Sequence, residues 1–182
     1  MQVEVSIQDC FFSSSASAAV DNSFNSVASE AIPEGIAPET WEIWFYRWME
    51  SLHPDIPPAD AYELSLRLTD DEEMQALNSQ YRQQNKPTDV LAFASLEVDC
   101  PQAVELMEDT PLYLGDIAIS VDTAIRQAQQ QGHPLKTELA WLAAHGLLHL
   151  LGWDHPDEDS LSEMLNQQET LLQIIGLDIQ LN

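Results

Sequence analysis

The run from Leu139 to Trp153 is the most apolar stretch of the 182-residue chain, and only His145 and His149 in it can carry charge. These two histidines are four residues apart, so on a helix they lie one turn apart on the same face. Gly152 can take the left-handed conformation that ends a helix. The reversal there can bring His155 back towards the other two. The pattern predicts three imidazoles converging from a helix and the turn after it.

Three converging imidazoles are typical of a divalent metal site, and zinc is the expected ion. Three protein ligands leave a coordination position for water, as in catalytic rather than structural zinc sites. The alternative for any one of these histidines is a core residue that donates to a backbone carbonyl. The zinc-peptidase helix has the pattern His-Glu-x-x-His, in which the glutamate is the general base. Gly146 takes that position here, which argues against a peptidase.

The charge composition of the chain constrains which ligands it can bind. The chain has 31 acidic side chains against six basic ones and a formal charge of −25. Proteins that hold RNA through its backbone generally carry a basic patch, so composition alone disfavours a nucleic-acid ligand. An enzyme needs only local positive charge, and Arg82 and Lys86 lie close together in the sequence. We expect weak general affinity for RNA, delivery by protein partners or the ribosome, and an acidic, solvated surface.

Hydrophobic periodicity predicts an α/β (α+β) sandwich with about four strands in a single domain, residues 1–182. Strands are expected at 3–7, 62–68, 89–93 and 114–121. Helices are expected from about 38, from Asp70 to about Arg82, at 122–131, from Pro134, and at 157–175. The Ser/Ala/Asn-rich segment 13–36 reads as a flexible insertion or, alternatively, as a partner-docking segment. Residues 95–111 read as an acidic loop.

Sequence features also predict where the protein resides. The chain has no apolar run of some 18 residues, so no membrane span is expected. Its start lacks the basic and apolar regions of a signal peptide. Cys10 and Cys100 are far apart and show no metal-ligand spacing, which favours reduced thiols. A cytoplasmic location follows.

Four motifs together resemble one known family, the YbeY-type endoribonucleases or rRNA maturation factors. The first is His145-Gly-x-Leu-His-Leu-x-Gly-x-Asp-His155. The others are Leu77-Asn-x-x-Tyr-Arg82 with Lys86-Pro-Thr-Asp-Val-Leu-x-Phe93, then Gly115-Asp-Ile-x-Ile119, and Glu138 seven residues before His145. They occur in the family's order over about residues 40–177. The chain departs from the usual pattern in having Asn85 for an acidic residue, and Ala92 and Ala94 for Ser and Pro.

The resemblance implies a zinc-dependent, single-strand-specific endoribonuclease that acts in rRNA processing, in 16S rRNA 3′ end maturation and in ribosome quality control. It implies one zinc ion per chain, held by His145, His149 and His155. Single-stranded RNA, ribosomal RNA and ribosomal or assembly-factor proteins are the implied partners. It also implies a mixed sheet with the histidine helix at its centre.

Four further residues are candidates for the chemistry. Arg82 is the expected phosphate clamp, because its planar fork matches two oxygens, although it can instead pair with a carboxylate. Lys86 is a candidate RNA contact. Glu138 can orient a ligand or act as base, or be a solvated residue at a helix start. Asp154 can support His155 through a hydrogen bond or serve ordinary turn chemistry.

Three functions therefore remain open. The first is a metal-dependent endoribonuclease with Arg82 and Glu138 as catalytic residues and Arg82 and Lys86 as substrate-binding residues. The second is a ribosome-associated assembly factor whose zinc is mainly structural. The third is a zinc hydrolase of a small molecule or peptide.

Overall fold

The computed structural model describes residues 1–13, 34–96 and 110–179. Four strands form one sheet in the order β1-β2-β4-β3. Its strands are β1 (Gln2–Asp9), β2 (Ala61–Thr69), β4 (Leu112–Ser120) and β3 (Val90–Ala94). The first three are mutually parallel and β3 runs antiparallel to β4 at one edge, so the sheet is mixed. The sheet prediction is confirmed.

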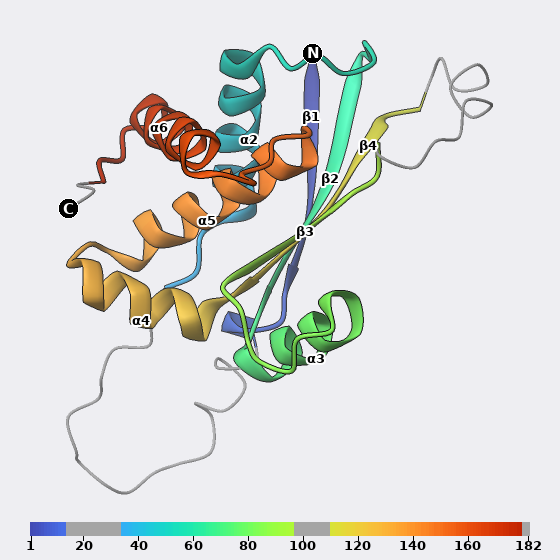
Figure 1. Ribbon diagram of the computed structural model, residues 1–182. Coiled ribbons are helices and arrows are strands. Elements are labelled where there is room, and N and C mark those ends of the chain that lie inside the picture. The colour runs from blue at the N-terminus through green and yellow to red at the C-terminus, as the bar shows by residue number, and fades with distance from the viewer. Residues whose placement is uncertain (14–33, 97–109, 180–182) are drawn as a thin grey trace, which may run out of the picture.

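Helices lie against both faces of this sheet (Figure 1). One face carries α2 (Pro38–Leu52), α4 (Val121–Gln131), α5 (Leu135–Leu150) and α6 (Glu158–Ile174), and α3 (Asp71–Arg82) stands near the other face. All five helices agree with the periodicity of the sequence. The expected insertion at 13–36 and the acidic loop at 95–111 fall largely outside the described residues.

The main core lies between the sheet and the first group of helices. In β2, Leu64, Leu66 and Leu68 point to one face and are buried, because alternate residues of a strand share a face. The aromatic side chains of α2 that face this layer include Trp41, Phe45 and Trp48, each fully buried. Trp48 also donates its indole N–H to the Leu171 carbonyl of α6, at 2.8 Å.

The histidine helix α5 lies at the centre of this layer. It contacts β3 and β4 on one side and α4 and α6 on the others, which explains why its sequence is apolar nearly all round. Gly146 lets it approach the sheet closely, because a Cβ there would meet Cγ2 of Ile117 on β4 at 2.7 Å. Among the described residues, no helix is long and apolar enough to cross a membrane.

Candidate metal centre

The turn after α5 positions the third histidine. Gly152 has φ +92°, the left-handed conformation expected from the sequence. The Trp153 N–H bonds the Leu148 carbonyl at 2.9 Å and the Gly152 N–H bonds the His149 carbonyl at 3.1 Å, so α5 ends in a Schellman motif. The chain reverses here and brings His155 back beside the helix.

The three imidazoles meet as the sequence predicts. Each offers a ring nitrogen, and these atoms all lie within 4.8 Å of one another. The ring centroids of His145 and His149 are 4.6 Å apart, and His155 lies 5.6 and 5.3 Å from them. This cluster can hold a metal ion.

Hydrogen bonds to Nδ1 of His145 and His149 determine that Nε2 of each ring faces the centre of the cluster. Nδ1 of His149 lies 2.9 Å from the Trp153 carbonyl, and Nδ1 of His145 lies 2.9 Å from Oε1 of Gln168. Because both oxygens only accept, each Nδ1 carries the proton and donates it. The Nε2 atoms of His145 and His149 then face each other at 3.0 Å, each with a bare lone pair. Two facing lone pairs at this distance repel unless a cation lies between them.

The donor set therefore fits a metal such as zinc. Two nitrogen ligands of a tetrahedral zinc ion stand about 3.3 Å apart, given bonds of ~2.0–2.1 Å. Burial lowers the pKa of both His145 and His149, and the nearby imidazoles lower the pKa of His149 further. The lowered pKa favours the neutral form of both rings, which is the form that binds a metal ion.

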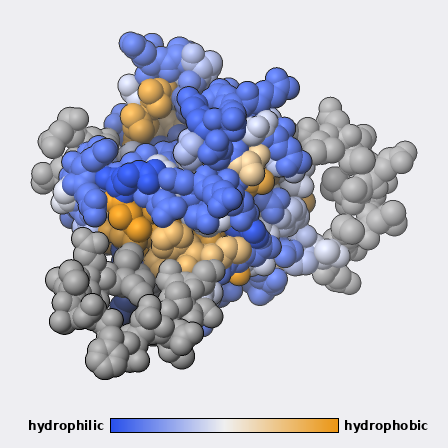
Figure 2. Space-filling model, turned by 90° about the horizontal axis from the view of Figure 1, so that it is seen from below, coloured by the Kyte–Doolittle hydropathy of each residue, from blue (hydrophilic) through white to orange (hydrophobic). Residues whose placement is uncertain are grey.

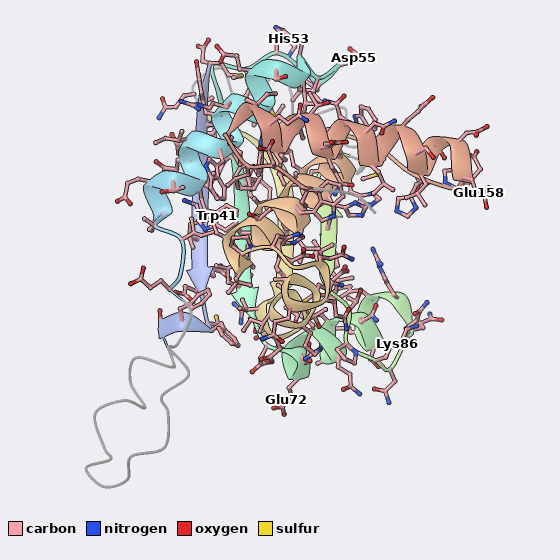
Figure 3. The ribbon with its side chains drawn as sticks, turned by 90° about the vertical axis from the view of Figure 1, so that its left-hand side faces the viewer. Trp41, His53, Asp55, Glu72, Lys86 and Glu158 are labelled. Carbon is pink, nitrogen blue, oxygen red and sulfur yellow. The ribbon has the colours of Figure 1, made fainter. Side chains whose placement is uncertain are left out.

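The histidines line a pocket of about 330 Å³ that opens beside β3. Its walls bring together Arg82 from the end of α3, strand residues of β3, and the turn after α5. Figure 3 shows that Lys86, just after α3, and Glu158, at the start of α6, lie on the same side of the molecule. The pocket-lining residues are Arg82, Thr88, Asp89, Val90, Ala92, His145, Gly146, His149, Asp154 and His155.

Of the other predicted site residues, Asp154 lines the pocket, whereas Lys86 and Glu138 do not. Lys86 is exposed in the loop after α3, where its carbonyl accepts from the buried Asn78 amide at 2.8 Å, and it does not line the pocket. Glu138 is also absent from the pocket wall: its buried carboxylate contacts Nε2 of His133 at 2.5 Å. Burial is the main cause that raises the pKa of Glu138, opposed by His133. Asp154 accepts from the His155 backbone N–H at 2.8 Å, which is turn chemistry.

Sequence reasoning missed Gln168. This residue is fully buried between α6 and α5, 23 positions along the chain from the histidine that it contacts. The available signal was its place in the apolar stripe of α6, with Met164 before it and Leu171 and Leu172 after it. A polar residue in such a stripe is buried and needs hydrogen-bond partners.

Fold and site together define an α/β protein with a cluster of three histidines that can hold a metal ion beside an arginine. A sequence model of the family described as Endoribonuclease YbeY matches residues 27–176. The chain belongs to this family of nucleases, which are hydrolases of phosphodiester bonds.

Individual relatives agree over the whole chain. It is 60% identical to the endoribonuclease YbeY of Nostoc sp. (strain PCC 7120) over 182 residues, 100% of this chain and 95% of that protein. It is 59% identical to the endoribonuclease YbeY of Trichormus variabilis, again over 100% of this chain and over 99% of the relative. A solution structure of TM1509 from Thermotoga maritima aligns with a TM-score of 0.50 and 25% identity. That alignment covers 79% of this chain and 87% of the other.

Proposed function

We propose that this protein is a zinc-dependent, single-strand-specific endoribonuclease that acts in rRNA processing, including 16S rRNA 3′ end maturation, and in ribosome quality control. One observation carries the proposal: three imidazole nitrogens within 4.8 Å share a pocket with an arginine. Membership of the Endoribonuclease YbeY family supports the reaction class. The cluster supports one ion per chain, held by His145, His149 and His155.

Zinc is proposed because the ligands are three neutral imidazoles. When bound, zinc would polarise a phosphoryl oxygen and lower the pKa of a bound water towards ~7. The chain's own contribution is to fix the ring orientations of the ligands. It does so through the Trp153 carbonyl and the Gln168 amide, each 2.9 Å from the outer nitrogen of its histidine.

Arg82 is the proposed phosphate-binding and catalytic residue. It ends α3 and lines the same pocket as the histidines, close enough for its positive charge to contribute to lowering the pKa of His145. A guanidinium can donate two parallel hydrogen bonds to a phosphate and stays charged throughout. Such a group would hold the scissile phosphate against the imidazole cluster.

Lys86 and Glu138 have more distant roles in this proposal. Lys86 is exposed and lies two residues before Thr88 of the pocket wall, which suits contact with RNA outside the cleaved bond. Glu138 shares α5 with two of the ligands, and its carboxylate is buried against His133. This position supports an orienting role for Glu138 more than direct contact with substrate. As partners we propose single-stranded and ribosomal RNA and ribosomal or assembly-factor proteins, in the cytoplasm.

The test is cleavage of labelled single-stranded RNA by the purified protein. Cleavage should stop after treatment with a chelator, return when Zn²⁺ is added, and be lost in His145→Ala. The matched control is His53→Ala, which changes an exposed histidine at the end of α2 (Figure 3) and should cleave at the wild-type rate.

Cleavage that persists both in the chelator and in His145→Ala would overturn the proposal. A protein that binds zinc but cuts no RNA would instead favour an assembly factor with a structural metal. Cleavage of a peptide or a small ester in place of RNA would favour the third class, a zinc hydrolase of small substrates.

A further inference from the structure

Gln168 is the buried polar side chain of the α5–α6 interface that reaches the metal centre. It is fully buried, and its amide is held at both ends. Nε2 lies 3.3 Å from the Trp141 carbonyl of α5, and Oε1 lies 2.9 Å from Nδ1 of His145. Since a carbonyl can only accept, the Trp141 contact fixes the amide with its nitrogen towards the backbone. Its oxygen must then face the imidazole.

That orientation decides where the proton of His145 resides. Oε1 is an acceptor, so Nδ1 must be the protonated nitrogen, and Nε2 is left bare towards the pocket. Without this acceptor, the proton has a competing position on Nε2. There it would donate across 3.0 Å to the bare Nε2 of His149. Such a bond would block two of the three metal-binding nitrogens at once.

The two ligands of α5 are therefore oriented by different means. His149 is held by a backbone carbonyl, that of Trp153, which no side-chain substitution removes. His145 depends on a single amide brought in by another helix. Loss of a hydrogen-bond partner of a metal-binding histidine typically lowers metal affinity 10- to 100-fold.

We propose that Gln168 is a positioning residue that keeps His145 in the Nδ1-protonated form and so holds its Nε2 ready for the metal. This inference rests on the metal site of the proposed function. It adds a role for α6, whose packing against α5 thereby becomes a determinant of metal affinity. The role needs an acceptor at this point and not a particular side chain.

The experiment measures Zn²⁺ affinity by competition with a chelator, on the full-length protein and its variants. Gln168→Leu should bind Zn²⁺ about 10- to 100-fold more weakly, because the acceptor is gone. Gln168→Glu keeps an oxygen at the same place and should stay within a few-fold of wild type. The control is Gln173→Leu, the same change at an exposed position of α6, which should leave the affinity unchanged.

A second measurement follows the proton itself. In the metal-free protein at pH 8, ¹⁵N NMR of the imidazoles should show His145 protonated on Nδ1 in wild type and on Nε2 in Gln168→Leu. Gln168→Met, which keeps the length of the side chain, serves the same purpose if the leucine variant does not fold.

Leucine or methionine variants with Nδ1-protonated His145 and Zn²⁺ affinity within twofold of wild type would overturn the inference. If the wild type binds no Zn²⁺, the proposed function fails. The NMR comparison still decides separately whether Gln168 sets the protonated nitrogen.

Discussion

At the scale of single residues, the histidine cluster combines residues that are close in the sequence with a partner that is far away in it. The three histidines lie within eleven positions, so helix spacing and a glycine stop were enough to predict their meeting. Gln168 comes from a different helix, and its contact with His145 depends on how α6 packs on α5. The place of Arg82 was predictable only in part. The sequence placed it near a helix end, but only tertiary packing brings that end to the pocket.

Arg82→Lys tests the geometry of the arginine rather than its charge. If the guanidinium holds phosphate through two parallel bonds, a lysine point charge cannot replace it, and RNA cleavage should fall at least about tenfold. Metal content should not change, since Arg82 is not among the three residues that could hold the ion. Cleavage rates and elemental analysis of the same preparation check both statements. The matched control is Arg47→Lys, on the exposed surface of α2. An Arg82→Lys protein with the wild-type rate would remove Arg82 from the mechanism.

At the scale of elements, helix starts and stops were predictable because capping is local chemistry. Asp70 accepts from the Glu73 N–H at 2.9 Å, as the sequence suggested for the start of α3. A full capping box would also need the Glu73 side chain to accept from the Asp70 N–H, but the Glu73 carboxylate pairs with Arg67 of β2 instead. Strand order was not predictable from periodicity, which shows that a strand exists but not which strand lies beside it. The edge position of antiparallel β3 depends on long-range pairing.

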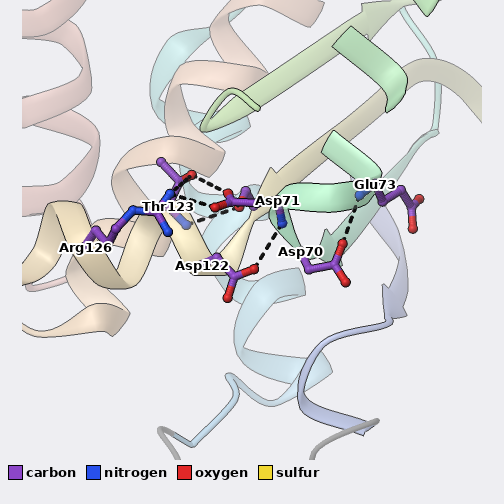
Figure 4. Close-up of polar contacts among 7 residues, drawn as sticks. Asp70, Asp71, Glu73, Asp122, Thr123 and Arg126 are labelled. Atoms are coloured by element: carbon purple, nitrogen blue, oxygen red, sulfur yellow. Dashed lines mark hydrogen bonds and ion pairs between the residues drawn. The ribbon is translucent and has the colours of Figure 1, made fainter. Parts of the chain in front are cut away.

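Asp71 ties the starts of α3 and α4 together (Figure 4). Its Oδ1 accepts from the hydroxyls of Ser120 and Thr123, each at 2.6 Å, and its Oδ2 accepts from Arg126 at 2.7 Å. Burial raises the pKa of this carboxyl, but these bonds together outweigh it and lower the pKa below its usual value. A lowered carboxyl pKa stabilises the folded state above the unfolded value, near 4, and this stability is lost as pH falls through the folded value.

Asp71→Asn should therefore destabilise the protein in a pH-dependent way. At pH 7 we expect a loss of about 1–2 kcal/mol, because the new amide NH₂ faces the Arg126 donors. The difference from wild type should shrink as pH falls below about 4. Urea unfolding at pH 7 and pH 3 measures it, and Asp55→Asn, an exposed loop position, controls for the change in net charge. An equal loss at both pH values would contradict the assignment.

At the scale of the whole molecule, half of the few positively charged side chains already contact acidic or aromatic side chains. Of the six basic residues, Arg67 pairs with Glu73 and Arg126 with Asp71, and Lys136 lies over the Trp44 ring at 5.5 Å. Arg82 and Lys86 remain near the pocket, while Arg47 lies on the exposed surface of α2. The face in Figure 2 is mostly hydrophilic with smaller apolar areas. With a net charge of −25, any RNA-binding surface of this chain is small and local.

Salt dependence should therefore be shallow and binding of isolated RNA weak. Each phosphate contact adds roughly 0.7 to the slope of log affinity against log salt for a single strand, so two contacts give about −1.4. Titration of labelled single-stranded RNA at several salt concentrations measures this slope.

Lys86→Ala should flatten the slope by about 0.7. Arg47→Ala removes the same charge on α2 and should leave the slope unchanged. A slope several units steeper would reveal a longer basic path along the protein. Recognition would then no longer require ribosomal or assembly-factor proteins to bring the RNA to the pocket.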